Sequence, residues 1–463
     1  MRAMLKTFLT RLGTPALCLL AVAAPLSAWL TLPGFAAGGA HARSALCLFD
    51  LLVWPALLLA LLVRLQEEGL RGVLKALLRV PAAAWFLLAL SAWSGLAWPR
   101  LTGSEPSGLS GVCKELFQLA EYAVAAYVAV AELGRGERSR RWAALALQAG
   151  FALVLVVGLA QYFGPRSDFD VGSLLKNRNS LGAFLAAAVP FCLVLALGRS
   201  GCCCGWRPLW AALAAGGALL AITAGAVLGI AVGVLAGAAL LGRLRLAVAV
   251  AGLVVLFAIG QALPRHNLSA AAESVRVERT SPREPSQKLL AMRYLRAGYE
   301  TNVLRASLGP EGGRLFFGLG PGNYGQRKTE FRPALDDRPA GQTDNPANYD
   351  VLSDEPGTFN LYGQAAVELG ILGLLGFLWL FASWAGTALG AWRRNGEEIS
   401  EPLAAAVFAA LVGAAVASAF GSAWIRGVGE GLEVMAALAA AELRGEAPPA
   451  AVESRVRVLP PGS

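Results

Sequence analysis

Two arginines in the polar stretch 264–363 have the spacing and the chemistry of an anion site. Arg293 and Arg296 are three residues apart in a segment with helical periodicity, so their side chains project from neighbouring positions on one helical face. A guanidinium group matches phosphate oxygens in pairs and keeps its charge at physiological pH, which suits it to a diphosphate. We therefore predict that both arginines act in catalysis by holding a diphosphate. The alternative is a solvated amphipathic helix on a membrane surface.

A third arginine, Arg178, lies in the run Lys-Asn-Arg-Asn at 176–179, shortly before an apolar stretch. The predicted topology places it in the same compartment as the stretch 264–363, where its fixed charge can meet a phosphate group. Asn177 and Asn179 flank it with amide groups. We predict that all three side chains bind substrate.

A proton acceptor for such a site is predicted at Glu355, which precedes a turn at Pro356 and Gly357 and comes shortly before Asn360. A carboxylate that is partly desolvated at the edge of a membrane becomes a stronger base, which suits it to deprotonate an attacking hydroxyl group. The alternative is a solvated acid that pairs with nearby arginines.

Glycines and an acid within an apolar run complete the candidate site. The run Gly-Leu-Gly-Pro-Gly-Asn at 318–323 allows close backbone approach, so we predict that Gly320, Gly322 and Asn323 bind substrate. A simple turn is the alternative for this run. Glu368 falls within a predicted membrane span, where a carboxylate is unfavourable enough to indicate function unless it lies at a helix end or pairs with an arginine.

The sequence predicts neither a metal site nor a cofactor. Its seven cysteines include no CxxC pair with a histidine partner, and three of them adjoin at 202–204. Its two histidines, His41 and His266, lie in no recognisable constellation, so a histidine base is not predicted either.

The composition is that of an all-α polytopic membrane protein. Apolar residues make up 56% of the 463-residue chain and charged residues only 15%, whereas a soluble domain is about a quarter charged. About twelve apolar stretches are long enough for transmembrane helices. They are 15–36, 45–63, 81–98, 115–133, 142–162, 181–198, 208–222, 225–242, 246–263, 364–391, 402–420 and 424–443. Basic loops at a membrane explain the net charge of +9, and nucleic acid is not a predicted partner.

The distribution of basic residues predicts which side of the membrane each connection faces. Twenty Lys and Arg residues lie in the termini and connections of one side, against seven in the short connections of the other. By the positive-inside rule both termini are cytoplasmic and the stretch 264–363, between the ninth and tenth helices, is a large extracytoplasmic loop. This order depends on a break at Thr223, because one continuous helix over 208–242 would invert every later segment.

The predicted organisation follows from these assignments. Nine transmembrane helices occupy residues 1–263, and the loop that carries most of the candidate site occupies 264–363. Three further transmembrane helices occupy 364–443. The tail 444–463 is rich in Pro, Ala and charge, and we predict that it is disordered in the cytoplasm.

The order of these features resembles the O-antigen ligase family of polytopic membrane glycosyltransferases. The segments that carry the resemblance are Lys114–Tyr122, Gly158–Phe163, Asn177–Phe184, Gly318–Tyr324 and Phe359–Gly373, of which the last is the most specific. About twelve helices with a large periplasmic loop between the ninth and tenth also match that family.

The resemblance implies an enzyme of the bacterial inner membrane. Such an enzyme transfers a glycan from a polyprenyl diphosphate carrier to a glycan or lipid acceptor on the periplasmic face, among membrane lipids and without metal or nucleotide. Arginines would stabilise the departing lipid diphosphate, and a base would assist the attack of the acceptor hydroxyl.

The chain departs from the family at two places. It has Thr-Ala-Gly at 223–225, where members commonly have Ser-Arg-Gly, and Phe359-Asn360, where they commonly have His-Asn. Asn360 therefore remains a predicted substrate-binding residue without its histidine neighbour. Either the predicted arginines and Glu355 rebuild the site, or this branch uses a different acceptor, or the activity is lost.

Three alternatives to a glycan ligase remain open. An O-antigen or exopolysaccharide polymerase shares the carrier but extends one glycan with another. A polysaccharide transporter or flippase would also have about twelve helices, but it should show repeat symmetry and broken spans that face each other, and the sequence shows neither. A catalytically silent assembly scaffold is compatible with the missing histidine.

Overall fold

The computed structural model describes residues 13–22, 48–77, 81–97, 109–134, 136–163, 178–198, 207–221, 223–255, 314–321, 360–399, 402–420, 432 and 434–440. Every secondary-structure element in these residues is helical, and no strand occurs among them. Within these residues three helices are long and apolar enough to cross a membrane, namely Arg138–Phe163, Ser180–Leu197 and Leu361–Arg394. The predicted all-α class is confirmed for this part of the chain, and these helices are of the kind that membrane proteins contain.

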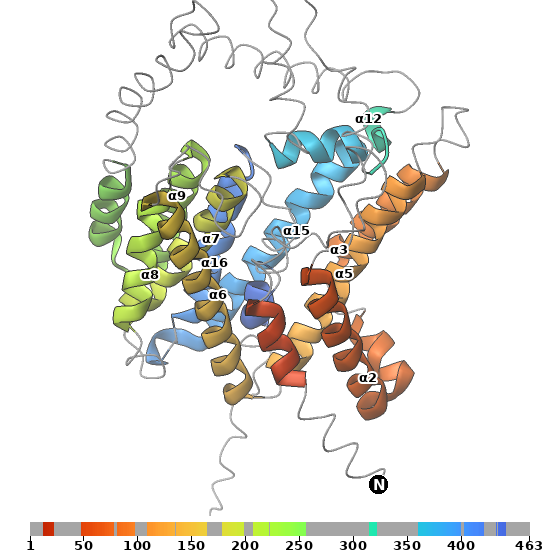
Figure 1. Cartoon of the computed structure of the whole chain (residues 1–463), viewed down its shortest axis with the longest axis horizontal. Helices are drawn as coiled ribbons and strands as arrows, with labels where there is room; N and C mark the ends of the chain where they lie inside the picture. The colour runs from red at the N-terminus through yellow and green to blue at the C-terminus, as the bar shows by residue number, and fades with distance from the viewer. Residues whose placement is uncertain are drawn as a thin grey trace, which may run out of the picture.

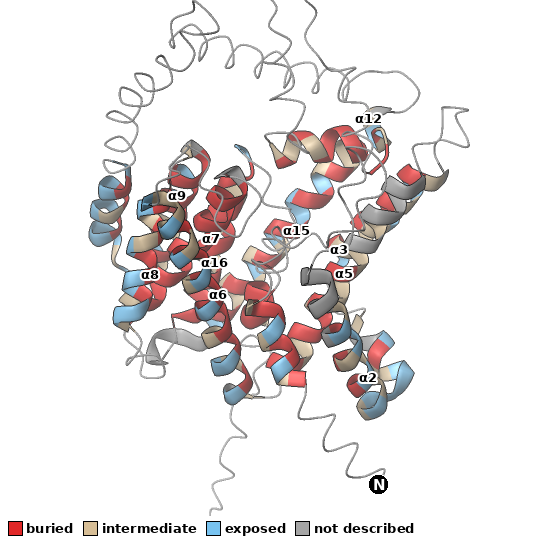
Figure 2. Ribbon diagram, in the orientation of Figure 1, coloured by how far each residue is buried: buried red, intermediate tan, exposed pale blue. Residues whose placement is uncertain are grey.

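The main elements stand side by side as a bundle, with α12 near the upper end of α15 (Figure 1). In chain order they are α2 (Leu48–Leu77), α3 (Ala82–Ala92), the π-helical turn η2 (Trp93–Ala97), α5 (Leu109–Leu133), α6 (Glu137–Phe163), α7 (Arg178–Leu197), α8 (Arg207–Leu220), α9 (Ala224–Leu240), α12 (Arg314–Phe317), α15 (Leu361–Ile399) and α16 (Leu403–Ala417). Shorter helices comprise Gly13–Val22, Leu244–Val255 and residues 434–440. Figure 2 shows that α7 is buried along most of its length, whereas α2, α6 and α8 have exposed outer faces.

The centre of the bundle is formed by α7, α9 and α16, which pack through glycines. Gly229, Gly233 and Gly237 recur every four residues on α9 and so lie along one of its faces. A Cβ on Gly233 would lie 2.6 Å from the carbonyl oxygen of Ala409 on α16 and 2.8 Å from Cγ of Pro190 on α7. Because apolar side chains gain little by leaving lipid for a helix interface, membrane helices associate through close backbone approach, which small residues allow.

Helix α8 runs antiparallel to α7. The ring centroids of Trp210, near the start of α8, and Phe191, in the second half of α7, are 5.9 Å apart. Gly217, near the end of α8, packs against Leu185, in the first half of α7. The start of α8 therefore lies beside the second half of α7, and the end of α8 lies beside the first half of α7.

Helix α9 runs in the opposite direction, parallel to α7. Its first residues lie beside the start of α7, where Thr223 contacts Gly182, and its last turn lies beside the end of α7, where Gly237 contacts Val194. The side-chain oxygen of Thr223 accepts a hydrogen bond from Ala226 N–H at 3.3 Å and so caps α9. The predicted break at Thr223 is thus confirmed, and the stretch contains two antiparallel helices.

Helix α16 extends from one end of this bundle to the other. The N–H of Leu361, at the start of α15, donates to the carbonyl of Ser418 at 2.9 Å, so α15 begins where α16 ends. Pro402, at the start of α16, packs against Gly198, just past the end of α7. We name these two ends of the bundle the Leu361 end and the Pro402 end.

The second predicted helix, 45–63, extends past residue 63 in the structure. Helix α2 consists of two helices that meet at a kink at Gly69, whose φ is 68°, and the second of them ends at Leu77. The buried Arg64 donates from Nη2 to Oε1 of Glu132 on α5 and from Nη1 to Oε1 of Glu68, both at 3.0 Å. This ion cluster sustains the helix beyond its apolar part, because oppositely charged residues one turn apart stabilise a helix.

Cysteine labelling tests the predicted sides of the membrane. Phe316, in α12, is exposed and lies beside α15, whereas the exposed Arg245 follows Arg243, which donates to the carbonyl of Leu197 at the Pro402 end. In a chain whose seven native cysteines are replaced by alanine, we expect a membrane-impermeant maleimide to label Phe316→Cys in right-side-out vesicles and Arg245→Cys in inside-out vesicles. The reverse pattern would place the Leu361 end in the cytoplasm.

Candidate functional site

Helix α15 departs from helical geometry at Gly370, whose φ is +71°. This left-handed conformation favours glycine, because the Cβ of any other residue would crowd the backbone. A Cβ on Gly370 would also lie 2.6 Å from the backbone nitrogen of Phe317, and nearer still to the carbonyl group of Phe316. The break leaves a short first segment of α15, residues 361–369, whose last carbonyls need hydrogen-bond partners from outside the helix.

Those partners come from residues 314–321, which comprise α12 and the turn after it and which we call the strap. Leu319 N–H donates to the carbonyl of Val367, and Gly320 N–H donates to the carbonyl of Glu368, each at 2.8 Å. Figure 1 shows the strap against the upper part of α15. Two carbonyls at the helix break are therefore satisfied by the strap, much as a chain after a helix C-terminus satisfies the last carbonyls.

The π-helical turn η2, which follows α3, contacts the same junction. Ser94, in η2, is buried, and its hydroxyl donates to the carbonyl of Phe317 in the strap. The carbonyl oxygen of Glu368 lies 3.4 Å from the same hydroxyl, and the ring centroids of Trp93 and Phe317 are 6.4 Å apart. Single π-helical turns within helices frequently occur at functional sites, because they redirect the side chains that follow.

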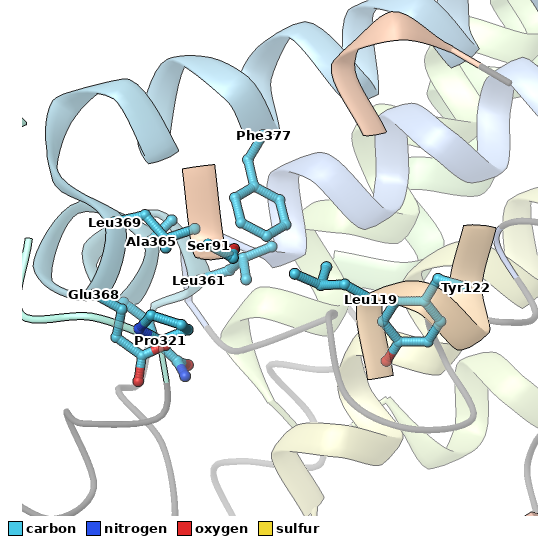
Figure 3. Close-up of a pocket in the computed structure, with 10 residues that line it drawn as sticks. Ser91, Leu119, Tyr122, Pro321, Leu361, Ala365, Glu368, Leu369 and Phe377 are labelled. Carbon is cyan, nitrogen blue, oxygen red and sulfur yellow. The ribbon is translucent and has the colours of Figure 1, made fainter. Parts of the chain in front are cut away.

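A pocket of about 60 Å³ lies beside this junction (Figure 3). The described residues that line it come from α3, α5, the strap and α15, and they are Ser91, Leu119, Tyr122, Pro321, Leu361, Gln364, Ala365, Glu368, Leu369 and Phe377. Four of these side chains are polar and the others are apolar. The volume accommodates a few water molecules or one small polar group of a larger ligand.

The carboxylate of Glu368 dominates the chemistry of the pocket. The residue is only 8% exposed, and among the described lining residues it is the one with a charged side chain. An ionised carboxylate can only accept hydrogen bonds, whereas the hydroxyl and amide groups of Ser91, Tyr122 and Gln364 can both donate and accept. The arrangement can hold a hydroxyl group and accept its proton. Among the described residues, no cluster of His, Cys, Asp or Glu has the geometry of a metal site.

Three predicted site residues, Gly320, Asn360 and Glu368, have described contacts, and the structure joins two of them. Gly320 and Glu368 are joined by the backbone hydrogen bond of the strap, and the side chain of Glu368 lines the pocket. Asn360 has a structural role as the cap of α15, because its Oδ1 accepts from the N–H groups of Tyr362 at 2.9 Å and Gly363 at 3.2 Å.

The other predicted site residues stay predictions. Arg178 and Asn179 form the first turn of α7, and their side chains lie outside the described part of the structure. Outside the described residues altogether are Asn177, Arg293, Arg296, Gly322, Asn323 and Glu355.

Three polar residues of the pocket, Ser91, Tyr122 and Gln364, are not among the site residues predicted from the sequence. Gln364 precedes Glu368 by one helical turn and shares its face, so a helical projection of α15 would have found it. Ser91 gives no comparable signal, because a single serine in an apolar helix is ordinary. Its importance arises from the contact between α3 and α15, which the sequence does not show.

Comparison with known proteins does not supply a family for this arrangement. No protein-family model matches the chain, and no curated protein matches it significantly. A function for the chain therefore has to be inferred from its own residues.

Proposed function

We propose that the chain is a membrane glycosyltransferase of the O-antigen ligase type. It transfers a glycan from a polyprenyl diphosphate carrier to a hydroxyl group of an acceptor, on the extracytoplasmic face of the bacterial inner membrane. The observation that carries the proposal is the hydrogen bond between Gly320 N–H and the carbonyl of Glu368. It joins Gly318–Tyr324 to Phe359–Gly373, two of the segments that carry the family resemblance, beside a pocket with a buried carboxylate.

The proposed reaction is a single displacement at the anomeric carbon of the glycan. The acceptor oxygen forms a bond to this carbon as the bond from the carbon to the diphosphate oxygen breaks, and the electron pair leaves with the diphosphate. The hydroxyl proton passes to a carboxylate. Because Glu368 lines the pocket, it takes the role that the sequence alone predicts for Glu355.

The leaving diphosphate requires cations, because its negative charge rises as the bond breaks. In the proposal Arg178, Arg293 and Arg296 keep this role, for which the guanidinium group is suited by its paired donors and its permanent charge. The extracytoplasmic location of all three follows from the predicted topology.

A deletion strain tests the proposed function. Without the gene, we expect polyprenyl-diphosphate-linked glycan to accumulate and the mature glycan-bearing product to disappear, because the step that consumes the carrier-linked glycan is missing. Mass spectrometry of lipid extracts measures both pools, and expression of the intact chain from a plasmid should restore them. Unchanged pools in the deletion strain would refute the proposal.

Transfer by the purified chain in liposomes completes this test. Lipid extract from the deletion strain supplies the carrier-linked glycan, and we expect a heavier glycan product to form in the presence of EDTA and without added nucleotide. The mass of the acceptor in that product distinguishes a ligase, which extends a different molecule, from a polymerase, which extends a second carrier-linked glycan. No product with either acceptor would contradict the proposed activity.

A further inference from the structure

Ser91 differs in its hydrogen bonding from three other buried serines of the described bundle. Its side chain is fully buried, yet its hydroxyl has no hydrogen-bond partner among the described residues. Ser94, Ser139 and Ser418 are also buried, and the hydroxyl of each is hydrogen-bonded. A buried hydroxyl without a partner lowers the stability of a fold, so this hydroxyl is expected to have a partner that is not among the described residues, and a ligand bound in the adjoining pocket would supply one.

Ser91 lines the pocket that contains Glu368. Figure 3 shows Ser91 next to Leu361 and Phe377, with the carboxylate of Glu368 at one side of the pocket and the phenol of Tyr122 at the other. Side chains from three different helices therefore enclose the space that Ser91 lines. A small polar group placed there would meet polar partners between apolar walls, which is the usual composition of a ligand site.

Hydrogen-bonding capacity decides which chemical class fits this space. The oxygens of a diphosphate only accept hydrogen bonds, and so does the carboxylate of Glu368, so the two groups cannot bond to each other. A hydroxyl group of a neutral sugar can donate to Glu368 and at the same time accept from Ser91. The apolar side chains of Leu361 and Phe377 suit the carbon atoms that bear such a hydroxyl.

We propose that this pocket binds one hydroxyl-bearing arm of the neutral acceptor sugar, with Ser91 as a direct ligand, and that the donor diphosphate binds outside it. This assignment rests on the proposed function and names the substrate that occupies the described part of its site. The volume of about 60 Å³ admits a single arm of a sugar together with little or no water. The rest of the acceptor then extends out of the pocket.

The first test compares stability with ligand binding. We expect Ser91→Ala to unfold at the same temperature as the parent chain or higher, because the substitution removes a buried hydroxyl that no described residue uses. The matched control is Ser139→Ala, which loses the hydrogen bond to Thr14 Oγ1 at 3.1 Å and should unfold at a lower temperature. An equal loss of thermal stability in both variants would assign Ser91 a structural role and overturn the proposal.

The second test measures binding with defined probes, methyl glycosides of neutral hexoses and inorganic pyrophosphate. We expect at least one methyl glycoside to raise the unfolding temperature of the purified full chain, with an affinity about fivefold to tenfold lower in Ser91→Ala and unchanged in Ser139→Ala. Any stabilisation by pyrophosphate should be the same in all three proteins. Glycoside binding that is absent, or independent of Ser91, would overturn the proposal, and so would pyrophosphate binding that Ser91→Ala weakens.

The transfer assay separates this inference from the proposed function. In an active chain, Ser91→Ala should raise KM for the acceptor about fivefold to tenfold and leave KM for the carrier-linked donor unchanged. A rise in the donor KM alone would place Ser91 at the diphosphate and refute the assignment. If the parent chain transfers no glycan but binds a methyl glycoside through Ser91, the pocket is a sugar site and only the proposed reaction fails.

Discussion

Replacing Gly370 by alanine is expected to lower the free energy of unfolding by at least about 2 kcal/mol and to abolish glycan transfer. The left-handed φ of +71° alone disfavours a side chain by roughly 1–2 kcal/mol. The new Cβ would also overlap the backbone of Phe316 and Phe317, which cannot move aside as a flexible side chain can. The strap would therefore be displaced, and its hydrogen bonds through Leu319 and Gly320 would be lost.

Gly386→Ala is the matched control, since it makes the same substitution in the same helix. No atom lies within 4 Å of the position that its Cβ would take, and its backbone is helical. We expect the free energy of unfolding to stay the same or to rise by up to about 1 kcal/mol, because alanine favours a helix over glycine. Denaturation in detergent micelles, followed by tryptophan fluorescence, measures both variants.

Hydrogen exchange shows whether the strap moves as expected. In the parent chain the amides of Leu319 and Gly320 should exchange slowly, since both are hydrogen-bonded to α15. In Gly370→Ala they should exchange faster, while the amides of α9 and α16 keep their protection. Equal stability and equal exchange in Gly370→Ala and Gly386→Ala would contradict the close contact between strap and helix.

The sequence predicts that the strap and the first segment of α15 both belong to the site, but it does not predict the geometry of their contact. Gly320 and Glu368 are both predicted site residues, and the structure joins them by a hydrogen bond. The break at Gly370 is not predictable from the run Glu-Leu-Gly-Ile-Leu-Gly at 368–373, because glycines are also frequent in unbroken membrane helices. Only the contact with the strap requires the left-handed conformation.

The end of an apolar run and the end of a helix do not coincide in α2. The apolar run before Arg64 predicts a membrane span that ends at about residue 63. Arg64 and Glu68 are nevertheless good helix formers, and their ion pair one turn apart extends α2 as a helix past its apolar part. By contrast, Thr223 marks the start of α9 correctly, because threonine at an N-cap position is a local signal that needs no tertiary contact.

Ser91 and Tyr122 are not predicted as site residues because the pocket brings together distant parts of the sequence. Ser91 and Tyr122 are about thirty residues apart, and both are about 240 residues or more from Glu368. Their association depends on α3 and α5 packing near the start of α15, and Ser94 fixes that packing through the strap. The partner that a polar residue of an apolar helix contacts in the folded bundle cannot be predicted from the sequence of that helix.

Replacing Glu368 by glutamine is expected to reduce the rate of glycan transfer by about 10²–10⁴-fold, with little change in stability. Glutamine keeps the shape of the side chain but cannot accept the proton of the acceptor hydroxyl. The matched control is Glu68→Gln, which removes a carboxylate that pairs with Arg64 away from the pocket and should transfer glycan at a nearly parental rate. Single-turnover transfer in liposomes measures the chemical step apart from substrate binding.

The same assay on Glu355→Gln decides between the two carboxylates. If Glu368 is the proton acceptor, Glu355→Gln should retain most of the parental rate, and Glu368→Asp should recover part of it, because a shorter carboxylate is still a base at a longer distance. If Glu355→Gln loses the rate and Glu368→Gln keeps it, the proton acceptor lies outside the pocket. Glu368 would then serve to bind the acceptor hydroxyl, and its replacement would raise the acceptor KM without lowering kcat.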